Sequence, residues 1–191
     1  MKRILFIAPF ETKGRYAGGI ASYAKTITTS DFFEKNGIKF IPLSSCQIKR
    51  SASSGGSLNI LNIINFFVLK RKIRKKIKTN SIDEIYINSS RNFALFKDTI
   101  LFSRRFLKNI PITIHIHFAE YDKVVLKNNF LRKIEIRRLK LFRKIIVLSQ
   151  NLKLDFIKNG FREEKIHVLY NYFQDTNVKS IESRSLNKPI N

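Results

Sequence analysis

The chain has 191 residues, of which 43% are hydrophobic, so it is long enough for one domain with an ordinary core. Its single cysteine, Cys46, excludes an internal disulfide and any multi-cysteine metal site, and indicates a reducing compartment. The 37 Lys and Arg against 14 Asp and Glu give a net charge of +23. This charge indicates an anionic partner such as nucleic acid, a phosphorylated substrate or an anionic membrane. A compositional bias towards Ile, Lys and Asn is the other explanation for the lysines.

The first residues are not typical of a signal peptide. Lys2 and Arg3 lead directly into a short apolar run that ends before Pro9, and this run is too short for the hydrophobic region of a signal. The longest apolar-rich stretch, residues 58–69, contains three asparagines and is too short to cross a bilayer. We therefore expect a cytoplasmic protein, with at most a peripheral association with the inner face of the cell membrane.

Strand-like and helix-like segments alternate along the chain. Short apolar runs predict six strands, at residues 3–8, 38–43, 83–89, 111–118, 144–149 and 166–170. Between them, apolar residues at helical spacing predict helices at residues 19–35, 58–78, 92–107, 129–143 and 151–159. The first helix should end at Asn36 and Gly37, a normal helix stop signal.

This alternation predicts an α/β fold: a doubly wound, Rossmann-like, mainly parallel sheet with helices on both faces. We assign residues 1–175 to this domain and residues 176–191 to a polar linker or tail. Ligands of such sheets bind beyond the carboxyl ends of the strands. The loops that should carry function therefore follow Ala8, Leu43, Ser89, Phe118, Ser149 and Tyr170.

Two adjacent glycines, Gly18 and Gly19, lie between the first strand and the first helix. Their loop lacks the glycine spacing of a dinucleotide fingerprint and also lacks the Walker pattern. A glycine pair at a helix N-terminus is suited to binding an anion or a sugar. From this segment alone, a tight strand-to-helix turn without a ligand is an equally good interpretation.

Two histidines, His115 and His117, lie at the end of the fourth predicted strand. They point to the same face because side chains of a strand alternate with a period of two. We predict no metal here, because no third ligand is evident unless Glu120 or Asp122 curls back. His115 also fits a hydrogen-bonded residue at a strand end. His117 is nearer the loop and is the better candidate for a functional contact.

Two predicted helices are strongly basic. In residues 129–144 a helical plot places Phe130, Leu131, Ile134, Leu141 and Phe142 on one side, and Arg132, Lys133, Arg137, Lys140, Arg143 and Lys144 on the other, with Arg138 out of place. In the second helix, Leu69, Ile73 and Ile77 are four residues apart, among the cations Lys70, Arg71, Lys72, Arg74, Lys75 and Lys76.

Both helices have the form of surfaces that rest on anionic lipid headgroups, at about 1 kcal/mol per basic residue. A face that is merely solvated is the alternative. Binding to RNA would also use cations, but usually adds exposed aromatic side chains. The aromatic residues here are mainly Phe at core spacing, so we expect no nucleic acid.

We predict no binding role for the polar segment at residues 88–92 or for Cys46. The polar segment at residues 88–92 follows the third strand and could bind a polar ligand, but we expect it to cap the next helix. Cys46 has no partner motif, and we predict no role for it.

Taken together, these segments resemble the N-terminal half of a GT-B glycosyltransferase of the retaining family 4. The resemblance is carried by KRILFIAPF followed by GGIASYAKTI, by the strand TIHIHF and by the block KIIVLSQNLKLDFIKNGFREEKIHVLYNYF, and it extends to about residue 173. It implies transfer of a sugar from a nucleotide-sugar to a glycan or lipid-linked acceptor, with retention at the anomeric carbon. Cell-surface polysaccharide synthesis is the process implied, and no metal or cofactor is expected beyond the nucleotide-sugar co-substrate.

The resemblance also implies roles for particular residues. Gly18 and Gly19 would let the first loop approach the sugar and phosphates, and His117 would match the histidine of the interdomain cleft near the transferred sugar. His115 would lie beside it as a substrate contact. Ser149 and Asn171 would line the cleft or shape its hinge. Acceptors at a membrane surface would suit the basic helices.

The family pattern also includes a second Rossmann-like domain with a Glu-x7-Glu motif, and no such pair occurs in these 191 residues. We therefore expect the chain alone to have little or no transferase activity, and a C-terminal domain or partner subunit to complete the site. The alternative is a non-catalytic basic α/β module that binds nucleic acid or another anionic polymer.

Overall fold

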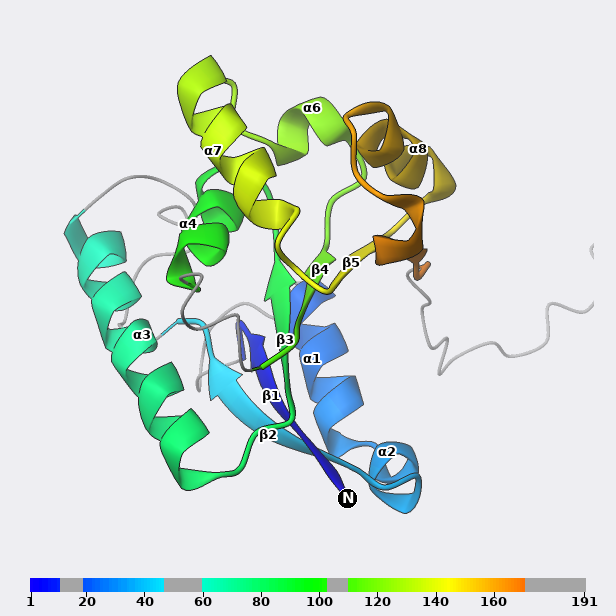
Figure 1. The fold of residues 1–191 in the computed structure, drawn as a ribbon. Coiled ribbons are helices and arrows are strands. Elements are labelled where there is room, and N and C mark those ends of the chain that lie inside the picture. Colours follow the sequence, from blue (N-terminus) through cyan, green and yellow to red (C-terminus); the bar gives the residue numbers. More distant parts are fainter. Residues whose placement is uncertain (11–18, 47–59, 103–109, 171–191) are drawn as a thin grey trace, which may run out of the picture.

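The computed structural model describes residues 1–10, 19–46, 60–102 and 110–170 (Figure 1). Within these residues a six-stranded, entirely parallel sheet has the order β2-β1-β3-β4-β5-β6. Its strands are β1 (Lys2–Ala8), β2 (Ile38–Ser44), β3 (Glu84–Ser89), β4 (Ile112–Ile116), β5 (Lys144–Val147) and β6 (Ile166–Val168). The predicted doubly wound α/β fold is confirmed.

Helices cover both faces of the sheet, with α3, α4 and α7 on one side and α1 on the other (Figure 1). The described helices are α1 (Gly19–Thr29), α2 (Asp31–Lys35), α3 (Ile60–Thr79), α4 (Phe93–Leu101), α6 (Tyr121–Val124), α7 (Asn129–Leu139), α8 (Gln150–Lys158) and the 3₁₀ turn η2 (Glu163–Lys165). The short α6 and η2 were not predicted.

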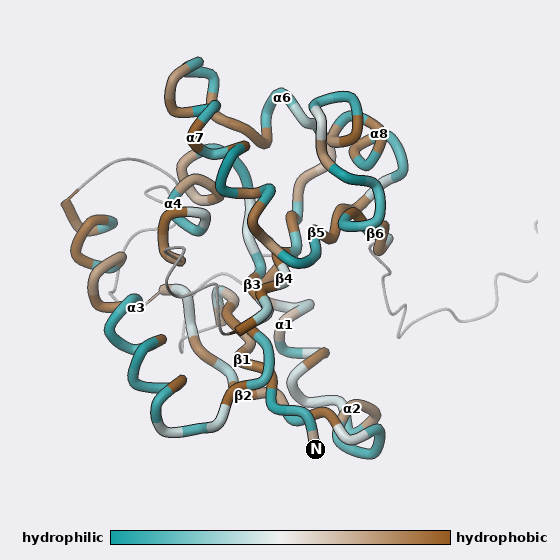
Figure 2. The backbone as a smooth tube through the Cα atoms, in the orientation of Figure 1, coloured by the Kyte–Doolittle hydropathy of each residue, from teal (hydrophilic) through white to brown (hydrophobic). Residues whose placement is uncertain are grey.

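The core follows from the period of two along the strands. Leu5 and Ile7 of β1 pack with Leu69 and Ile73 of α3, whereas Phe6 points to the other face. There Phe6 stacks on Tyr86 with 5.1 Å between ring centroids. Because both faces are covered, the central strands are largely buried and rich in apolar residues, although β3 and β4 also carry buried polar residues (Figure 2).

The strand order places the crevice of this sheet between β1 and β3. After β1 the chain adds β2 on one side, and it then returns to add β3 on the other side of β1. Ligands of open α/β sheets bind at such a switch point, beyond the carboxyl ends of the strands. The residues after Ala8 and at the end of β3 therefore frame the expected site.

The predicted helix at residues 19–35 is wrong as one element, because it is broken at Ser30, whose backbone is extended. The Thr28 and Thr29 hydroxyls donate to the carbonyls of Ala24 and Lys25 in the last turn of α1. Such bonds compete with continued helix, and Ser followed by Asp favours a new start. The predicted stop is confirmed, with Gly37 at a φ of 75°.

The apolar side predicted for residues 129–143 is also wrong. The helix α7 ends at Leu139, and its buried residues are Leu139 and Glu135. Phe130 is 71% exposed, and Phe142 is buried from the turn after the helix. Arg143 is also outside the helix, and its N–H donates to the Ile112 carbonyl at 3.0 Å. The helix ends at Leu139, four residues before the predicted end, and the chain enters β5 at Lys144.

Candidate active site

His117 directly follows β4 at the carboxyl edge of the sheet. Its backbone N–H donates to the Ser89 carbonyl at 2.9 Å, which continues the β3–β4 pairing by one residue. Its Nε2 lies 2.7 Å from Asn88 Oδ1. The Asn88 Nδ2 faces the Ile7 carbonyl of β1 at 3.5 Å. With the amide oriented in this way, His117 donates from Nε2, and its Nδ1 keeps a lone pair for a hydroxyl donor.

His115 is buried below His117 and belongs to a chain of aromatic polar groups. Its Nδ1 lies 2.9 Å from the Tyr86 hydroxyl, which in turn lies 3.2 Å from the Tyr23 hydroxyl. The Nε2 of His115 is buried and has no hydrogen-bond partner among the described residues. Three elements therefore meet in this network, with α1, β3 and β4 contributing one ring each.

The helix α1 contacts both imidazoles through Tyr23. The His115 and His117 ring centroids are 3.9 Å apart, and Tyr23 of α1 meets them edge-on at 5.3 Å and 5.1 Å. Gly19 is one turn before Tyr23, on the same side of α1. A Cβ at Gly19 would meet nothing within 4 Å, so local packing does not require glycine there. Gly18 lies outside the described residues.

Burial keeps the site uncharged at neutral pH. It lowers the pKa of His115 to about 3, with the neighbouring His117 as a second cause, and lowers the pKa of His117 to about 4. Burial, and then Tyr23, raise the pKa of Tyr86. The arrangement therefore offers neutral hydrogen-bonding groups to a polar, hydroxyl-bearing ligand.

The other two predicted substrate contacts are placed differently. Ser149 is the N-cap of α8, and its Oγ accepts from the Leu152 N–H at 3.2 Å. It follows the end of β5, the strand next to β4 in the sheet. Asn171 lies outside the described residues. The structure thus brings together His115, His117 and the helix that begins at Gly19, and it uses Ser149 to start a helix.

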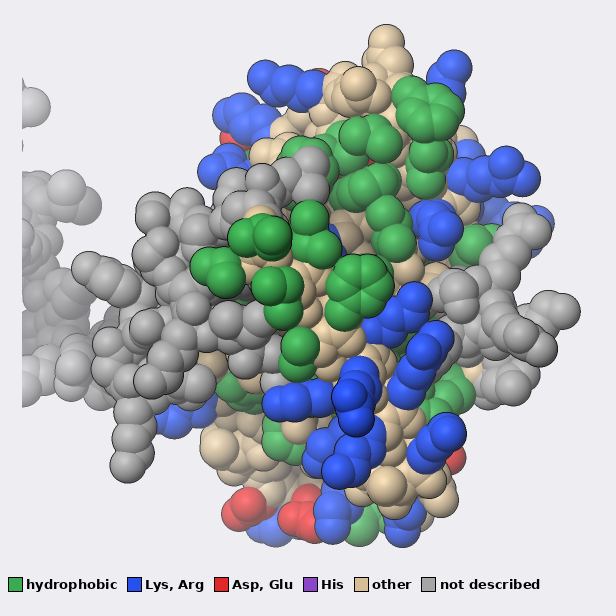
Figure 3. Space-filling model, turned by 90° about the vertical axis from the view of Figure 1, so that its left-hand side faces the viewer, with side chains coloured by type: hydrophobic (Ala, Val, Ile, Leu, Met, Phe, Trp, Pro, Cys, Tyr) green, Lys and Arg blue, Asp and Glu red, His purple; other side chains and the backbone are tan. Residues whose placement is uncertain are grey.

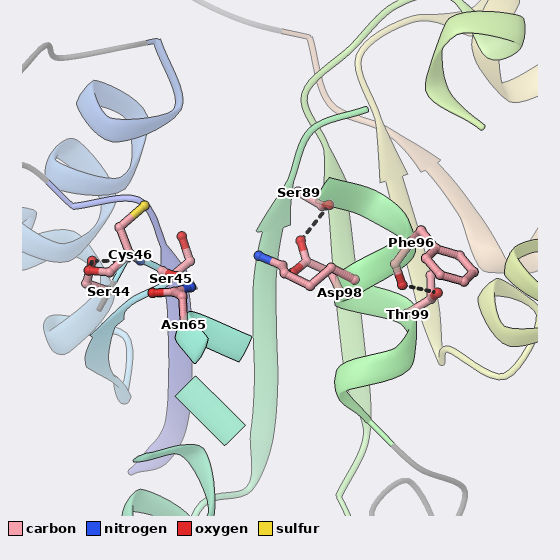
Figure 4. Close-up of polar contacts among 9 residues, drawn as sticks. Ser44, Ser45, Cys46, Asn65, Ser89, Phe96, Asp98 and Thr99 are labelled. Carbon is pink, nitrogen blue, oxygen red and sulfur yellow. Dashed lines mark hydrogen bonds and ion pairs between the residues drawn. The ribbon is translucent and has the colours of Figure 1, made fainter. Parts of the chain in front are cut away.

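The capping role expected for residues 88–92 is wrong. Asn92 is the N-cap of α4 but makes no side-chain cap bond, and its φ is 53°. Asn88 instead bonds His117, and the Ser89 hydroxyl donates to Asp98 Oδ2 at 2.7 Å. Figure 4 shows Ser89 of β3 and Asp98 of α4 pointing toward one another. Asn88 is therefore a site residue that sequence reasoning missed.

The other polar contacts of Figure 4 lie within α4 and around the end of β2. The second oxygen of Asp98 pairs with Lys97 Nζ at 3.0 Å. Asn65 of α3 is buried and donates to the Ser45 carbonyl at 3.0 Å. The N–H of Cys46 donates to Ser44 Oγ at 3.2 Å. The Ser89–Asp98 bond thus holds α4 against β3, and the Asn65–Ser45 bond holds α3 beside the end of β2.

The basic residues predicted to contact an anion lie on and near α3 and α7. On α3, Lys70 and Lys76 are half-buried, whereas the exposed cations are Arg71, Lys72, Arg74 and Lys75. Lys70 also lies over the Phe66 ring. Near α7, Arg132 is half-buried over the Tyr121 ring, whereas the exposed cations are Lys133, Arg137, Lys140 and Arg143.

The described residues contain neither a membrane-spanning helix nor a metal-binding cluster. No helix in the described ranges is long and apolar enough to cross a membrane. Over the same part of the chain, no group of three or more His, Cys, Asp or Glu side chains is placed to hold a metal ion.

Comparison with known proteins gives a family, and distant structural likenesses that include the following two. Anabaena HepE with bound UDP and glucose is 20% identical, with a TM-score of 0.49, over 91% of this chain and 45% of the other. The UDP-GlcNAc 2-epimerase of Methanocaldococcus jannaschii is 12% identical, with a TM-score of 0.49, over 88% of this chain and 45% of its own. The chain thus spans less than half the length of these proteins, and neither likeness says anything about its site.

No curated protein sequence matches the chain significantly. The family model described as Glycosyltransferase Family 4 matches residues 54–174, which is more than half of the chain. This stretch contains β3, β4, β5 and both histidines of the site. The chain belongs to Glycosyltransferase Family 4.

Proposed function

We propose that this chain is the acceptor-side domain of a retaining glycosyltransferase, which moves a sugar from a nucleotide-sugar to a glycan or lipid-linked acceptor in cell-surface polysaccharide synthesis. One observation carries the proposal beyond family membership. A neutral imidazole, His117, is fixed by Asn88 of β3 next to the switch point of the sheet, in contact with Tyr23 of α1. Such a group suits a sugar hydroxyl.

In this proposal the residues of the chain bind and orient the substrate. The Nδ1 of His117 accepts a hydrogen bond from a hydroxyl of the transferred sugar. The bond to Asn88 Oδ1 keeps the imidazole proton of His117 on Nε2. The first turn of α1 contains no acidic residue, so its N-terminal N–H groups and positive end suit the donor phosphates. Gly19 has no side chain, so it leaves room for the phosphates to approach the helix N-terminus.

A companion domain or subunit would supply the remaining contacts to the nucleotide and exclude water from the cleft. The acceptor would lie at the inner face of the membrane, where the cations of α3 and α7 contact anionic headgroups. No resident metal or cofactor is part of the proposal.

The experiment supplies the chain with a second domain from a member of the same family and follows label from a panel of nucleotide-sugars into membrane lipid. We expect transfer by the pair, and a loss of about 10²-fold in kcat/KM for His117→Ala, as for the removal of one preorganised polar group. His167→Ala is the matched control, because this third histidine is exposed on β6. The proposal fails if no second domain and no donor give transfer, or if His117→Ala is as active as the control.

Nucleic-acid binding keeps one specific observation in its favour. Phe67 on α3 and Phe130 on α7 are 61% and 71% exposed, so both basic helices present an aromatic ring. Binding to single-stranded RNA that falls steeply with salt, together with indifference to anionic vesicles, would establish this alternative.

A further inference from the structure

The helix α3 exposes apolar side chains in its first turns. Its buried side consists of Asn65, Leu69 and Ile73, which are four residues apart. Opposite this side, four large side chains are between 46% and 72% exposed: Ile60, Ile63, Ile64 and Phe67. We call these four residues the apolar end of α3.

The outward side of the same helix becomes cationic in its last turns. At 100° per residue, the apolar end shares one side of the helix with the exposed residues Arg71, Arg74, Lys75 and Lys78. We call these four residues the basic end. Figure 3 shows the green and blue patches one above the other on this face, and Figure 2 shows α3 changing from brown to mainly teal. Apolar and basic groups are thus separated along the helix axis rather than around it.

The apolar end is held in its exposed position by the domain. Leu69 and Ile73 are 0% and 1% exposed in the main core, and Asn65 is bonded to the Ser45 carbonyl at the end of β2. The helix therefore cannot rotate to hide Ile64 and Phe67 without removing its own core residues. An apolar surface fixed outward in this way is typical of an interaction site.

We propose that the apolar end of α3 inserts into an anionic lipid bilayer while the basic end remains on the headgroup phosphates. This inference rests on the membrane contact of the proposed function, and adds which side chains enter the membrane and how the domain is tilted. The centres of the two ends are about eleven residues apart, or roughly 16 Å along the axis. An apolar end about 5 Å deeper than the basic end corresponds to a tilt of roughly 20°.

The charge pattern favours lipid over other occupants. An anionic bilayer presents a negative layer and an apolar layer a few ångströms apart along its normal, which matches the two ends of a tilted α3. The long side chains of Arg71 and Lys75 can reach the phosphates from a helix that is partly immersed. A second copy would bring another chain of charge +23 against the same basic surface.

The absence of tryptophan from the sequence permits a direct test. Phe67→Trp places a single indole in the apolar end. Phe32→Trp, at a 65% exposed position on α2, is the matched control. Each full-length variant is mixed with vesicles of phosphatidylcholine with and without phosphatidylglycerol. Co-sedimentation measures binding, and the emission maximum and quenching by brominated lipid measure insertion. We expect binding only with phosphatidylglycerol, with a blue shift and quenching for Phe67→Trp alone.

Further variants separate insertion from attraction. Ile64→Glu should weaken vesicle binding at least tenfold, whereas Phe32→Glu should leave it unchanged. Vesicle binding without a blue shift of Phe67→Trp would refute insertion and leave only headgroup contact. A blue shift that grows with protein concentration without lipid, or one caused only by RNA, would also overturn the proposal. None of these readouts needs sugar transfer, so they can fail while transfer to a soluble acceptor succeeds.

Discussion

The two buried histidines should make the protein less stable in acid. Their pKa values in the folded chain are about 3 for His115 and about 4 for His117, against an ordinary value of 6.5. Below pH 6.5 the unfolded chain therefore binds more protons, and the stability present above that pH is lost as the pH falls toward 4. Between pH 7.5 and 5.0 the loss is about 2 kcal/mol for each histidine, or about 4 kcal/mol together.

Glu135 should oppose this loss. It is fully buried on α7, where its Oε2 accepts from the Leu126 N–H at 2.9 Å. Burial raises its pKa from 4.5 to about 7, although the Leu126 bond and the Arg132 charge act in the other direction. Its contribution to stability is fully present below pH 4.5 and is lost as the pH rises through 7. Between pH 7.5 and 5.0 it therefore adds about 2.5 kcal/mol, so the net loss is about 1.5 kcal/mol.

The assay is urea unfolding followed by far-ultraviolet circular dichroism at pH 7.5 and 5.0. The wild type should lose about 1.5 kcal/mol, Glu135→Gln about 4 kcal/mol, and Glu135→Gln with His117→Asn about 2 kcal/mol. His167→Asn, at an exposed position, is the control. If Glu135→Gln is no more sensitive to pH than the wild type, the reasoning from burial is refuted.

Three further predictions concern single positions. Asn88→Ala should free the His117 tautomer, seen as a change in its ¹⁵N chemical shifts; unchanged shifts would contradict the Asn88 bond. Gly19→Ala should change stability by less than about 1 kcal/mol, because a methyl fits there, yet weaken donor binding to the completed enzyme; equal affinity would remove the glycine from the site. On α3, Leu69→Ala should cost about 2–5 kcal/mol in urea unfolding and Phe67→Ala less than about 0.5 kcal/mol; equal costs would contradict the assigned faces.

The fold could be predicted because its strands are short runs rich in apolar residues that alternate with helical segments. All five residues of β4 are buried, and a run such as ITIHI can be covered only when helices pack on both faces of the sheet. Helix boundaries were less predictable because they depend on local hydrogen bonds of hydroxyl side chains. The hydroxyls of Thr28 and Thr29 bond to backbone carbonyls just before the break at Ser30. The period of 3.6 continues through such a break, so periodicity alone does not reveal it.

The site was only half predictable for a related reason. A period of two puts His115 and His117 on one face, and this placement can be predicted from their own strand. Their partners Tyr86 and Asn88 belong to another strand, and the contact depends on the register in which Asn88 is paired with His115. Read alone, the segment around Asn88 resembles a helix cap. Glu135 was missed because a carboxylate among cations reads as a surface residue, whereas its partner is the backbone of Leu126.

The neutrality of His117 decides which role it can have in the proposed reaction. At pH 7 a group with a pKa of about 4 is protonated in roughly one molecule in a thousand, a handicap of about 4 kcal/mol for a general acid. Acceptance of a hydrogen bond at Nδ1 is available in nearly every molecule. His117 should therefore position a sugar hydroxyl, and its replacement should alter kcat/KM among sugars that differ at that hydroxyl. An acidic limb of the pH–rate profile that disappears in His117→Gln would show that the imidazole transfers a proton instead.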